Sequence, residues 1–312
     1  MRRGGKKYRI LSLDGGGIRG LLAAILLERL EQAVPGWLER VELLAGTSTG
    51  GILALGLAHG LSPSDLRELY EKKGREIFDD SWLDDLRDLG RLVGAEYGNR
   101  NLARELTRLF GDTRLEDLEK RVLIPAFDLD NEKPDPGQRS WAPKFFHNFS
   151  GPDSDGAQPV WKVALYTSAA PAYFPSVDGY IDGGVAANNP AMAALAQTRD
   201  RRAFARPPPL DSVVLLSMGT GRSLMRIEGK NLNWGYAQWA RPILDILGEG
   251  LTGVADYQCR QMLAERYHRL APVFPAGERF PLDGVKRIPD LVAFAGGVDL
   301  SSAIAWLRRA WE

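Results

Sequence analysis

Apolar residues in the first sixty positions form two short continuous runs, each ending in glycines that a helical pattern follows. The runs occupy residues 8–13, "YRILSL", and 41–46, "VELLAG", and such runs are typical of buried strands. From Ile18 onward apolar residues recur every three or four positions, which predicts an amphipathic helix. Residues 49–60, "TGGILALGLAHG", are apolar on most sides and predict a buried helix. The order strand, helix, strand, helix predicts an α/β fold with a parallel sheet covered on both faces.

Residues 63–119 have a different pattern, in which charged amphipathic segments follow one another without an intervening strand. This pattern predicts a helical insertion, which could cover a site as a lid or pack as ordinary helices. Strands resume at 121–129 and 144–150, where apolar and aromatic residues predominate.

Beyond residue 158 helical and strand patterns alternate again. We expect a helix at 159–170, a turn in "YIDGGVAANNP" (180–190), a helix at 191–200 and a strand in "DSVVLLSMGTG" (211–221). The last segment, 232–312, predicts helices to which the sequence assigns no role. No repeat or low-complexity linker divides the chain, so we expect a single domain over residues 1–312.

The composition excludes several classes of protein. The chain is 44% hydrophobic and 26% charged, with 40 basic and 40 acidic residues, so no global field draws it to nucleic acid. The single cysteine, Cys259, allows no internal disulfide and no cysteine-based metal cluster. That is compatible with a reducing cytoplasm.

Two segments bear on membranes. The stretch 43–64 carries no Asp, Glu, Lys or Arg and is nearly long enough to span a bilayer, but five glycines interrupt it. A buried strand, turn and helix explain it better. The basic start, residues 2–9, lacks the apolar stretch of a secretory signal and could attract anionic lipid or remain a solvated tail. We therefore expect a cytoplasmic protein that can meet a membrane peripherally.

Residues 45–51 read "AGTSTGG", and the spacing Gly46-x-Ser48-x-Gly50 is that of a nucleophile elbow. Such an elbow is a tight turn from a strand into a helix that presents a serine hydroxyl to solvent. A serine hydroxyl is a weak nucleophile until a neighbouring base accepts its proton. Ser48 is therefore a candidate nucleophile that needs a base.

Three histidines are candidate bases. His59 lies on the helix that follows Ser48, roughly 16 Å along its axis, which is too far for contact. Nothing in the sequence places His147 near the elbow. His268 falls late in the chain, where an α/β-hydrolase has its histidine, but only one strand–helix unit precedes Ser48. A histidine-dependent carboxylesterase with His268 as its base is one alternative function.

The first predicted strand ends in "DGGGIRG", residues 14–20. Gly15, Gly16 and Gly17 leave the backbone free to expose its N–H groups at a helix start, which favours bound anions. If this turn adjoins the elbow, its amides can hold the oxyanion of a tetrahedral intermediate, with Asp14 bracing the turn. The letters also fit the dinucleotide pattern G-x-G-x-x-G, but the acidic residue expected after the next strand is missing there.

The remaining candidate base is Asp182 in "YIDGG", which by itself indicates no more than an Asp–Gly turn. Together, "DGGGIRG", "GTSTGG" and "DGG" at 182–184 resemble the patatin-like phospholipase family. The resemblance continues through "TSAAPAYFP" (167–175), "VAANNPA" (185–191) and "LSMGTG" (216–221), and so spans residues 8–221. It implies a three-layer α/β/α sandwich with a mostly parallel central sheet and a helical insertion.

The resemblance also implies a function. It implies a Ser–Asp dyad without histidine, in which Asp182 activates Ser48 and the turn Gly15–Gly17 forms the oxyanion hole. The reaction would be hydrolysis of fatty acyl esters in a phospholipid or lysophospholipid substrate, of phospholipase A or lysophospholipase type, without metal or cofactor. Arg19, in the first helical turn, is a candidate anchor for the substrate phosphate or a structurally paired arginine.

Two further functions share these motifs. One is a membrane-degrading phospholipase effector of bacterial antiviral defence that a nucleotide signal activates. The other is a binding protein that has lost catalysis. The sequence leaves open the headgroup, the acyl chain, the sn-position and the oligomeric state.

Overall fold

The structure, a computed structural model, describes residues 6–78, 98–171, 173–239 and 242–311. The strands are β1 (Tyr8–Leu13), β2 (Leu43–Gly46), β3 (Arg121–Asp128), β4 (Ala142–His147), β5 (Tyr180–Asp182), β6 (Val213–Met218) and β7 (Tyr267–Leu270). The helices are α1 (Gly20–Ala33), α2 (Thr49–Ala58), α3 (Pro63–Phe78), α4 (Asn99–Phe110), α5 (Val160–Thr167), α6 (Gly184–Ala187), α7 (Ala191–Gln197), α8 (Tyr236–Trp239), α9 (Pro242–Leu263), α10 (Ile288–Gly297) and α11 (Ser301–Trp306).

The described strands form one seven-stranded, mostly parallel sheet in the order β4-β3-β2-β1-β6-β7. Only β4 and β5 run antiparallel, and both pair with β3. Strand β4 pairs with one edge of β3 over residues 123–128. Strand β5 pairs with residues 126–128 of β3 and must therefore lie on the opposite edge, which is also the edge that pairs with β2. Thus β5 continues the line of β2 at the point where β2 has ended.

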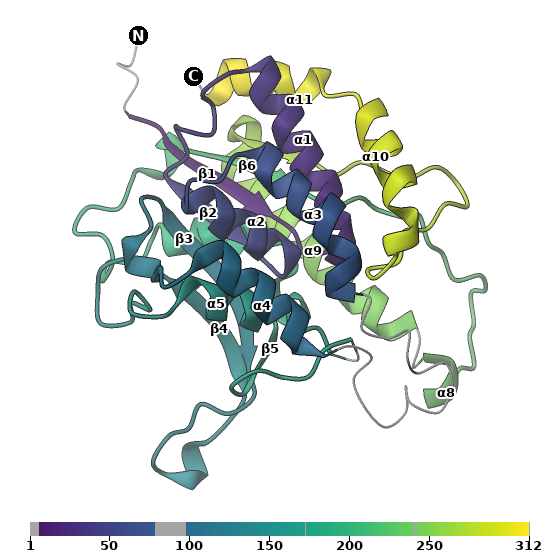
Figure 1. The fold of residues 1–312 in the computed structure, drawn as a ribbon, viewed down its shortest axis with the longest axis horizontal. Coiled ribbons are helices and arrows are strands. Elements are labelled where there is room, and N and C mark those ends of the chain that lie inside the picture. Colours follow the sequence, from purple (N-terminus) through teal and green to yellow (C-terminus); the bar gives the residue numbers. More distant parts are fainter. Residues whose placement is uncertain (1–5, 79–97, 172, 240–241, 312) are drawn as a thin grey trace.

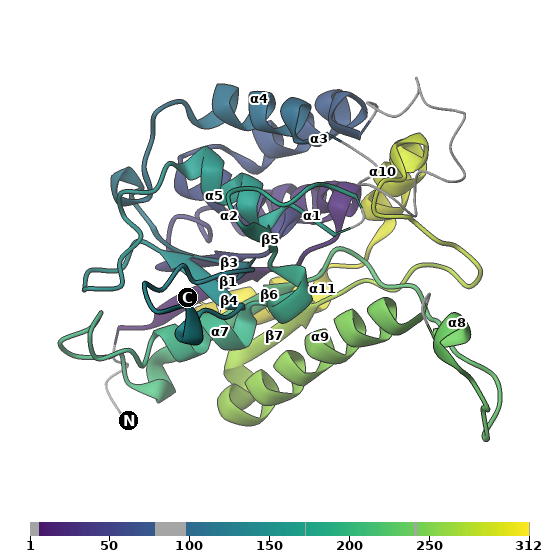
Figure 2. The ribbon, with the colours of Figure 1, turned by 90° about the horizontal axis from the view of Figure 1, so that it is seen from below.

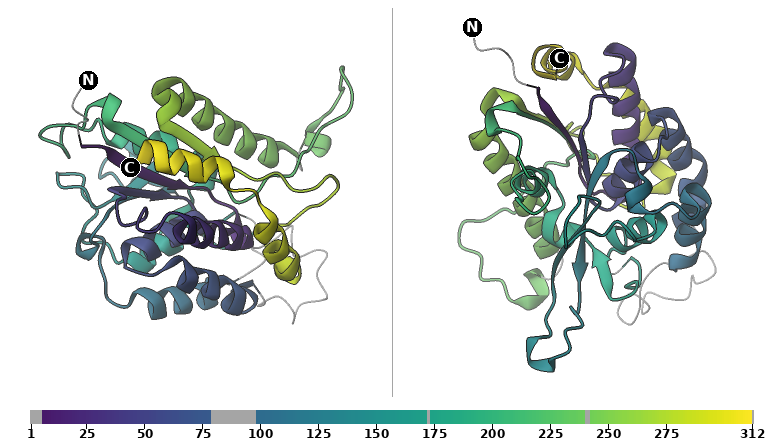
Figure 3. Two further views of the ribbon diagram at one scale, coloured as in Figure 1. Left: turned by 90° about the horizontal axis from the view of Figure 1, so that it is seen from above. Right: turned by 90° about the vertical axis from the view of Figure 1, so that its left-hand side faces the viewer.

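Helices cover both faces of this sheet (Figures 1 and 2). Successive residues of β1 point to opposite faces, so Leu11 joins the core with α1, α2 and α5, whereas Ile10 joins the core with α7 and α9. Helices α3 and α4 form an outer part of the first layer, and Figure 3 shows the sheet edge-on between the two layers. The predicted three-layer α/β/α architecture and mostly parallel sheet are confirmed.

Most predicted elements are present within two or three residues of their predicted bounds. The helical insertion predicted at 63–119 contains α3 and α4, while its residues 79–97 lie outside the described residues, as do residues 2–5 of the basic start. The uncharged stretch at 43–64 is the buried β2 and α2, as expected.

Two expectations were wrong in detail. The turn predicted around Asp182 contains a three-residue strand, β5, and a short helix, α6. The segment 232–312 is not wholly helical, because β7 lies within it and pairs with β6. The central residues of β7, His268 and Arg269, are polar, so the sequence shows no apolar run at this strand. Its backbone hydrogen bonds to β6 define the strand instead.

Among the described residues no single helix is long and apolar enough to cross a bilayer. Residues 285–297 and 301–311 reach that length and composition only as a pair, which is bent by 52°.

The C-terminal residues are anchored against the start of the sheet. Leu307–Trp311 continue α11 as a π-helical turn, and the Trp311 ring is fully buried, edge-to-face with Trp37 at 5.7 Å. The Trp311 indole N–H donates to the Trp37 carbonyl at 3.0 Å, while Arg9 Nε donates to the Trp311 carbonyl at 2.8 Å. Residues about 300 positions apart in the chain, Arg9 and Trp311, are thereby joined.

We expect Trp311→Ala to lower the free energy of unfolding by about 3–5 kcal/mol, because it leaves a large cavity beside the rings of Trp37 and Trp306. Urea denaturation followed by circular dichroism measures this. The matched control is Trp141→Ala, since Trp141 is 73% exposed and its truncation is expected to change stability little. Equal losses in the two variants would contradict the anchoring role.

Candidate active site

The turn between β2 and α2 forces Ser48 into an unusual backbone conformation, with φ 54° and ψ −125°. A Cβ atom at Gly46 would clash with the Gly50 carbonyl oxygen, and a Cβ at Gly50 would clash with the carbonyl oxygens of Leu13 and Asp14. Both glycines of the Gly-x-Ser-x-Gly motif are therefore required by lack of space. Strain of this kind at a nucleophile is typical of an elbow that projects a serine hydroxyl.

Hydrogen bonds from other elements hold this strained turn. The Thr47 amide donates to the Leu13 carbonyl at 3.1 Å, and the Thr47 hydroxyl donates to the Ala187 carbonyl at 2.6 Å. The Ser48 amide donates to Thr167 Oγ1, at the end of α5, at 2.9 Å. The elbow is thus tied to β1, α6 and α5 at once.

The glycine turn after β1 lies directly against the elbow. Strands β1 and β2 are parallel neighbours that pair Leu13 with Gly46, so both end at the same edge of the sheet. A Cβ at Gly15 would lie 3.3 Å from Ser48 Cβ. The expected adjacency of the two turns is therefore present in the structure.

The three glycine amides are not equivalent. The Gly15 N–H donates to the Asn188 carbonyl at 3.1 Å. The N–H groups of Gly16 and Gly17 donate to no acceptor within the described part of the chain. Gly17 adopts φ 56°, a left-handed conformation that favours glycine. Gly16 and Gly17 thus retain donors that could meet an anion beside Ser48, whereas the Gly15 donor is used within the fold.

Asp14 braces the glycine turn through a buried ion pair. Arg269 of β7 donates through Nη1 to Asp14 Oδ1 at 2.8 Å, and its Nη2 donates to the other carboxylate oxygen. The same Nη1 donates to Ser217 Oγ at 2.8 Å, and the Asp14 amide donates to the Met218 carbonyl at 2.9 Å. Burial opposes the charge of Arg269, but Asp14 outweighs that effect and raises the pKa of Arg269.

Asp182 ends β5, which brings its carboxyl group to Ser48. In the sheet Asp182 pairs with Ala126 of β3, three residues beyond Leu123, the last partner of β2. Burial raises the pKa of the Asp182 carboxyl to about 6, and hydrogen bonds from Ser48 and the Gly184 amide lower it in part. The Gly184 N–H donates to Asp182 Oδ1 at 2.7 Å.

Arg19 lies at the same cavity but is partly engaged. Its Nε donates to the Gly16 carbonyl at 3.3 Å and its Nη1 to the Gly221 carbonyl at 3.5 Å, both long hydrogen bonds. Desolvation lowers the pKa of Arg19, while the acidic groups of Asp245 and Glu249 across the cavity raise it. Arg19 therefore supports the glycine turn and keeps further N–H donors directed at the cavity.

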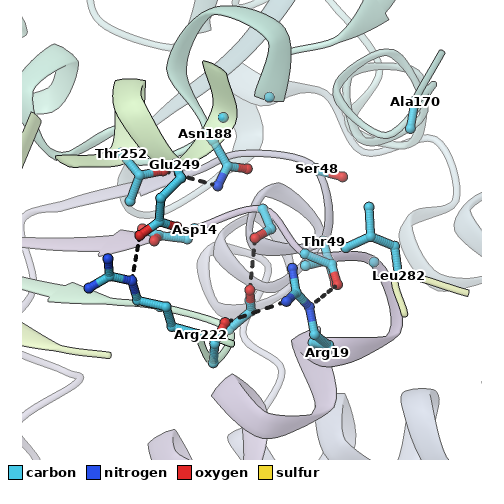
Figure 4. Close-up of a pocket in the computed structure, with 18 of the residues that line it drawn as sticks. Asp14, Arg19, Ser48, Thr49, Ala170, Asn188, Arg222, Glu249, Thr252 and Leu282 are labelled. Carbon is cyan, nitrogen blue, oxygen red and sulfur yellow. Dashed lines mark hydrogen bonds and ion pairs between the residues drawn. The ribbon is translucent and has the colours of Figure 1, made fainter. Parts of the chain in front are cut away.

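Ser48, Asp182, Arg19 and the three glycines line one cavity of about 1320 Å³. Figure 4 shows Ser48 and Arg19 on one side of this cavity, with Asn188, Arg222 and Glu249 on the side of α9. The residues of the described chain that line it include no histidine.

The three histidines lie elsewhere. His59 packs edge-to-face on Phe110 at 5.6 Å, and His147 packs on Phe149 at 5.7 Å. His268 stacks on Trp306 of α11 at 5.4 Å, on the face of β7 opposite Arg269. The structure therefore gives no geometric support to a triad that uses His268.

Three residues of this site were not predicted from the sequence: Thr167, Asn188 and Arg269. Thr167 and Asn188 do fall within motifs of the resemblance, "TSAAPAYFP" and "VAANNPA", so a position-by-position reading of those motifs could have found them. Arg269 has no such signal, because its partner Asp14 lies 255 positions away.

Comparison with known proteins finds a matching family model and several similar proteins. The model of a family described as patatin-like phospholipase matches residues 11–195. CotR of Bacillus subtilis, whose name describes a sporulation hydrolase, is 29% identical over 332 residues, which cover 98% of each protein. The cGAMP-activated phospholipase of Pseudomonas aeruginosa is 31% identical over 269 residues, or 84% of this chain and 78% of that protein. Among solved structures, VipD from Legionella pneumophila aligns with a TM-score of 0.40 and 10% identity, over 93% of this chain and 67% of its own.

We expect Asp182→Asn to stabilise the fold at neutral pH. Because the folded protein raises the pKa of Asp182 from 3.8 to about 6, it binds this proton more tightly than the unfolded chain does. Stability from this group is therefore present at low pH and is lost as pH rises from about 4 to about 6, by about 3 kcal/mol in total. Asn keeps an oxygen for the Gly184 amide but carries no charge.

Urea unfolding of both proteins at pH 4 and pH 8 measures the effect, and the gap between them should open with rising pH. The contrasting control is Asp178→Asn, because hydrogen bonds from Tyr166 and Lys162 lower the pKa of that exposed carboxyl. A gap that stays constant between pH 4 and pH 8 would show that Asp182 is not a destabilising buried acid.

Proposed function

The chain belongs to the patatin-like phospholipase family, and from that premise we propose that it hydrolyses fatty acyl esters of lipids with Ser48 and Asp182 as its catalytic pair. The observation that carries the proposal is the position of Ser48, at the strained elbow, beside the buried Asp182 carboxyl in one cavity, where the Ser48 hydroxyl lowers the pKa of that carboxyl in part. The Gly16 and Gly17 amides, which donate to no acceptor among the described residues and line the same cavity as Ser48, add the second requirement for acyl transfer.

The proposed steps use these groups in sequence. Ser48 Oγ attacks the ester carbonyl carbon while Asp182 accepts the hydroxyl proton. The Gly16 and Gly17 amides donate to the oxyanion, and the alcohol leaves with the proton from Asp182. Asp182 then takes a proton from water, whose oxygen attacks the acyl-serine, and the fatty acid departs as Ser48 regains its proton.

The environment of Asp182 favours this role. An ordinary aspartate is a weak base for a hydroxyl, and burial moves the pKa of Asp182 to about 6, closer to neutral. At neutral pH the carboxyl is therefore mostly ionised and able to accept a proton. Arg19 is proposed to bind the substrate phosphate with the N–H donors that face the cavity.

The cavity suits a long acyl chain. Its volume, about 1320 Å³, exceeds that of ordinary small-molecule pockets. Apolar residues from three helices and from the loop after α5 line it: Ile52, Leu69, Leu102, Leu106, Leu109 and Phe174. We propose that the acyl chain lies against this apolar wall and the ester against Ser48.

A second apolar surface supports contact with a membrane. Helix α9 carries an apolar stripe on its outer face: Ile243, Ile246, Leu247, Leu251, Val254 and Tyr257, which are 36–64% exposed. The stripe adjoins the cavity, because Ile246 belongs to both, and the exposed Leu224 and Met225 line the cavity as well. We propose that the α9 stripe rests on the lipid surface from which the substrate enters.

The direct test is lipid product analysis. We expect wild type to release fatty acid from mixed phospholipid and lysophospholipid vesicles in the presence of EDTA, and Ser48→Ala and Asp182→Asn to lose at least about 1000-fold in rate. The value of kcat/KM should fall tenfold per pH unit below about pH 6, because protonated Asp182 cannot act as a base. Mass spectrometry of the products also identifies the preferred lipid. Equal release by wild type and Ser48→Ala would exclude Ser48 as nucleophile.

The second candidate function is activation by a nucleotide signal. The observation that favours it is the similarity to the cGAMP-activated phospholipase of Pseudomonas aeruginosa over 84% of this chain. The same vesicle assay with and without cGAMP separates the two candidates. Release only with cGAMP would establish gating, whereas equal release in both would establish constitutive activity.

We expect Leu247→Gln and Val254→Gln in the α9 stripe to weaken vesicle binding by roughly tenfold each, since each removes apolar burial at the lipid surface. Vesicle flotation measures binding, and turnover of a soluble short-chain ester should remain unchanged, because neither residue lines the cavity. The control is Leu129→Gln, an exposed apolar residue that follows β3 and does not line the cavity. Loss of binding in the control as well would contradict a specific docking face.

A further inference from the structure

The Asn188 side chain lies between helix α9 and the catalytic elbow. Its Nδ2 donates to Thr252 Oγ1 of α9 at 3.3 Å, a contact that favours one orientation of the amide group. Figure 4 shows the amide nitrogen on the side of Thr252 and the amide oxygen turned toward Ser48. The side-chain oxygen of Asn188 therefore faces the reaction site.

Distances place this oxygen near both members of the proposed catalytic pair. A Cβ at Gly15 would lie 2.3 Å from Asn188 Oδ1 and 3.3 Å from Ser48 Cβ. A Cβ at Gly184 would lie 3.4 Å from Asn188 Oδ1 and 3.0 Å from Asp182 Oδ1. Asn188 Oδ1 thus has Ser48 on one side and Asp182 on the other, and all three residues line the cavity.

Asn188 Oδ1 is an acceptor with no donor among the residues that the structure describes. Other acceptors near the elbow are engaged. Arg269 donates to both carboxylate oxygens of Asp14. Thr167 Oγ1 receives the Ser48 amide. Because an amide oxygen can accept two hydrogen bonds, Asn188 can receive one from a molecule that enters the cavity.

The second half of the proposed reaction requires such an acceptor. Water carries two O–H groups, and Asp182 removes the proton of only one when water attacks the acyl-serine. Without an acceptor for the other O–H group, the water can rotate and turn its lone pair away from the acyl carbon. A simple alcohol carries one O–H group, so Asp182 alone satisfies it.

We propose that Asn188 is a further catalytic residue, whose side-chain oxygen accepts a hydrogen bond from the attacking water and orients it. The inference rests on the proposed hydrolysis and concerns its deacylation step. One O–H bond of the water breaks, and its proton passes through Asp182 to Ser48 Oγ as the acyl-serine bond breaks. The new C–O bond forms to the water oxygen. The second O–H group stays intact, bound to Asn188 Oδ1, and becomes the hydroxyl of the released fatty acid.

The test is a competition between water and methanol for the acyl-enzyme. Wild type and Asn188→Leu turn over a soluble short-chain ester at one methanol concentration, and mass spectrometry counts free acid and methyl ester. Asn188→Leu is expected to lower the acid-to-methyl-ester ratio by about tenfold, because it removes an acceptor that only water uses. Both products arise from one acyl-enzyme, so a smaller folded fraction or slower acylation cancels from the ratio.

Two further variants separate the oxygen from its surroundings. Asn188→Ala removes the same oxygen with less bulk and keeps the backbone carbonyl that accepts the Gly15 amide, so it should give the same fall in the ratio. Thr252→Val is the matched control. It removes the hydrogen bond to α9, leaves Asn188 Oδ1 in place and is expected to keep the wild-type ratio. A tenfold fall in Thr252→Val as well would assign the effect to α9 and overturn the proposal.

A kinetic measurement in the absence of methanol identifies the step. Asn188→Leu should leave kcat/KM for the ester unchanged, because kcat/KM reports the steps up to acylation. It should also accumulate acyl-enzyme, which mass spectrometry of the intact protein detects. A tenfold loss of kcat/KM without acyl-enzyme would place Asn188 in acylation and overturn its role in deacylation.

The outcomes distinguish this inference from the proposed function. Hydrolysis by wild type with an unchanged product ratio in both Asn188 variants would refute the role of Asn188 and leave the proposed function intact. If wild type forms neither product, with or without cGAMP, the proposed function fails and this inference fails with it.

Discussion

The close approach of two backbone turns is the constraint on which the rest of this site depends. The turns after β1 and β2 leave no room for a Cβ at Gly46 or Gly50, and Gly15 sits against the Ser48 side chain. The backbones of the two turns are in direct contact, and both turns lie at the same edge of the sheet. The Ser48 hydroxyl therefore lies at the same edge as the Gly16 and Gly17 amides, which donate to no acceptor among the described residues. The direction of α2, the strain at Ser48 and the position of an oxyanion all follow from that approach.

The supports of this arrangement come from distant parts of the chain. Arg269 lies beyond the residues that match the family model, 11–195, yet its buried ion pair with Asp14 holds the turn that carries Gly16 and Gly17. Thr167 holds the Ser48 amide, and Asn188 uses the Gly15 amide. An arginine and a carboxylate buried together make a directional brace, because neither can move without leaving the other uncompensated.

The sequence predicted the parts of the molecule that depend on local patterns. The two strand–glycine–helix units, the elbow and the layered sheet could be recognised because apolar periodicity and glycine spacing are local properties. Strands β5 and β7 could not, since they have three and four residues and owe their existence to pairing with β3 and β6. Nor could spacing reveal that the Gly15 amide donates to the Asn188 carbonyl.

The insertion of β5 beyond the end of β2 also has a stereochemical consequence. Seen from Ser48, the free amides lie on the side of β1 and Asp182 lies on the side of β3. On the proposed chemistry an ester carbonyl must turn its oxygen toward β1 and its leaving alcohol toward Asp182. The Ser48 hydroxyl can therefore attack only one of the two faces of the carbonyl. On the proposed chemistry, the order of strands in the sheet therefore determines which face of the ester carbonyl meets the Ser48 hydroxyl.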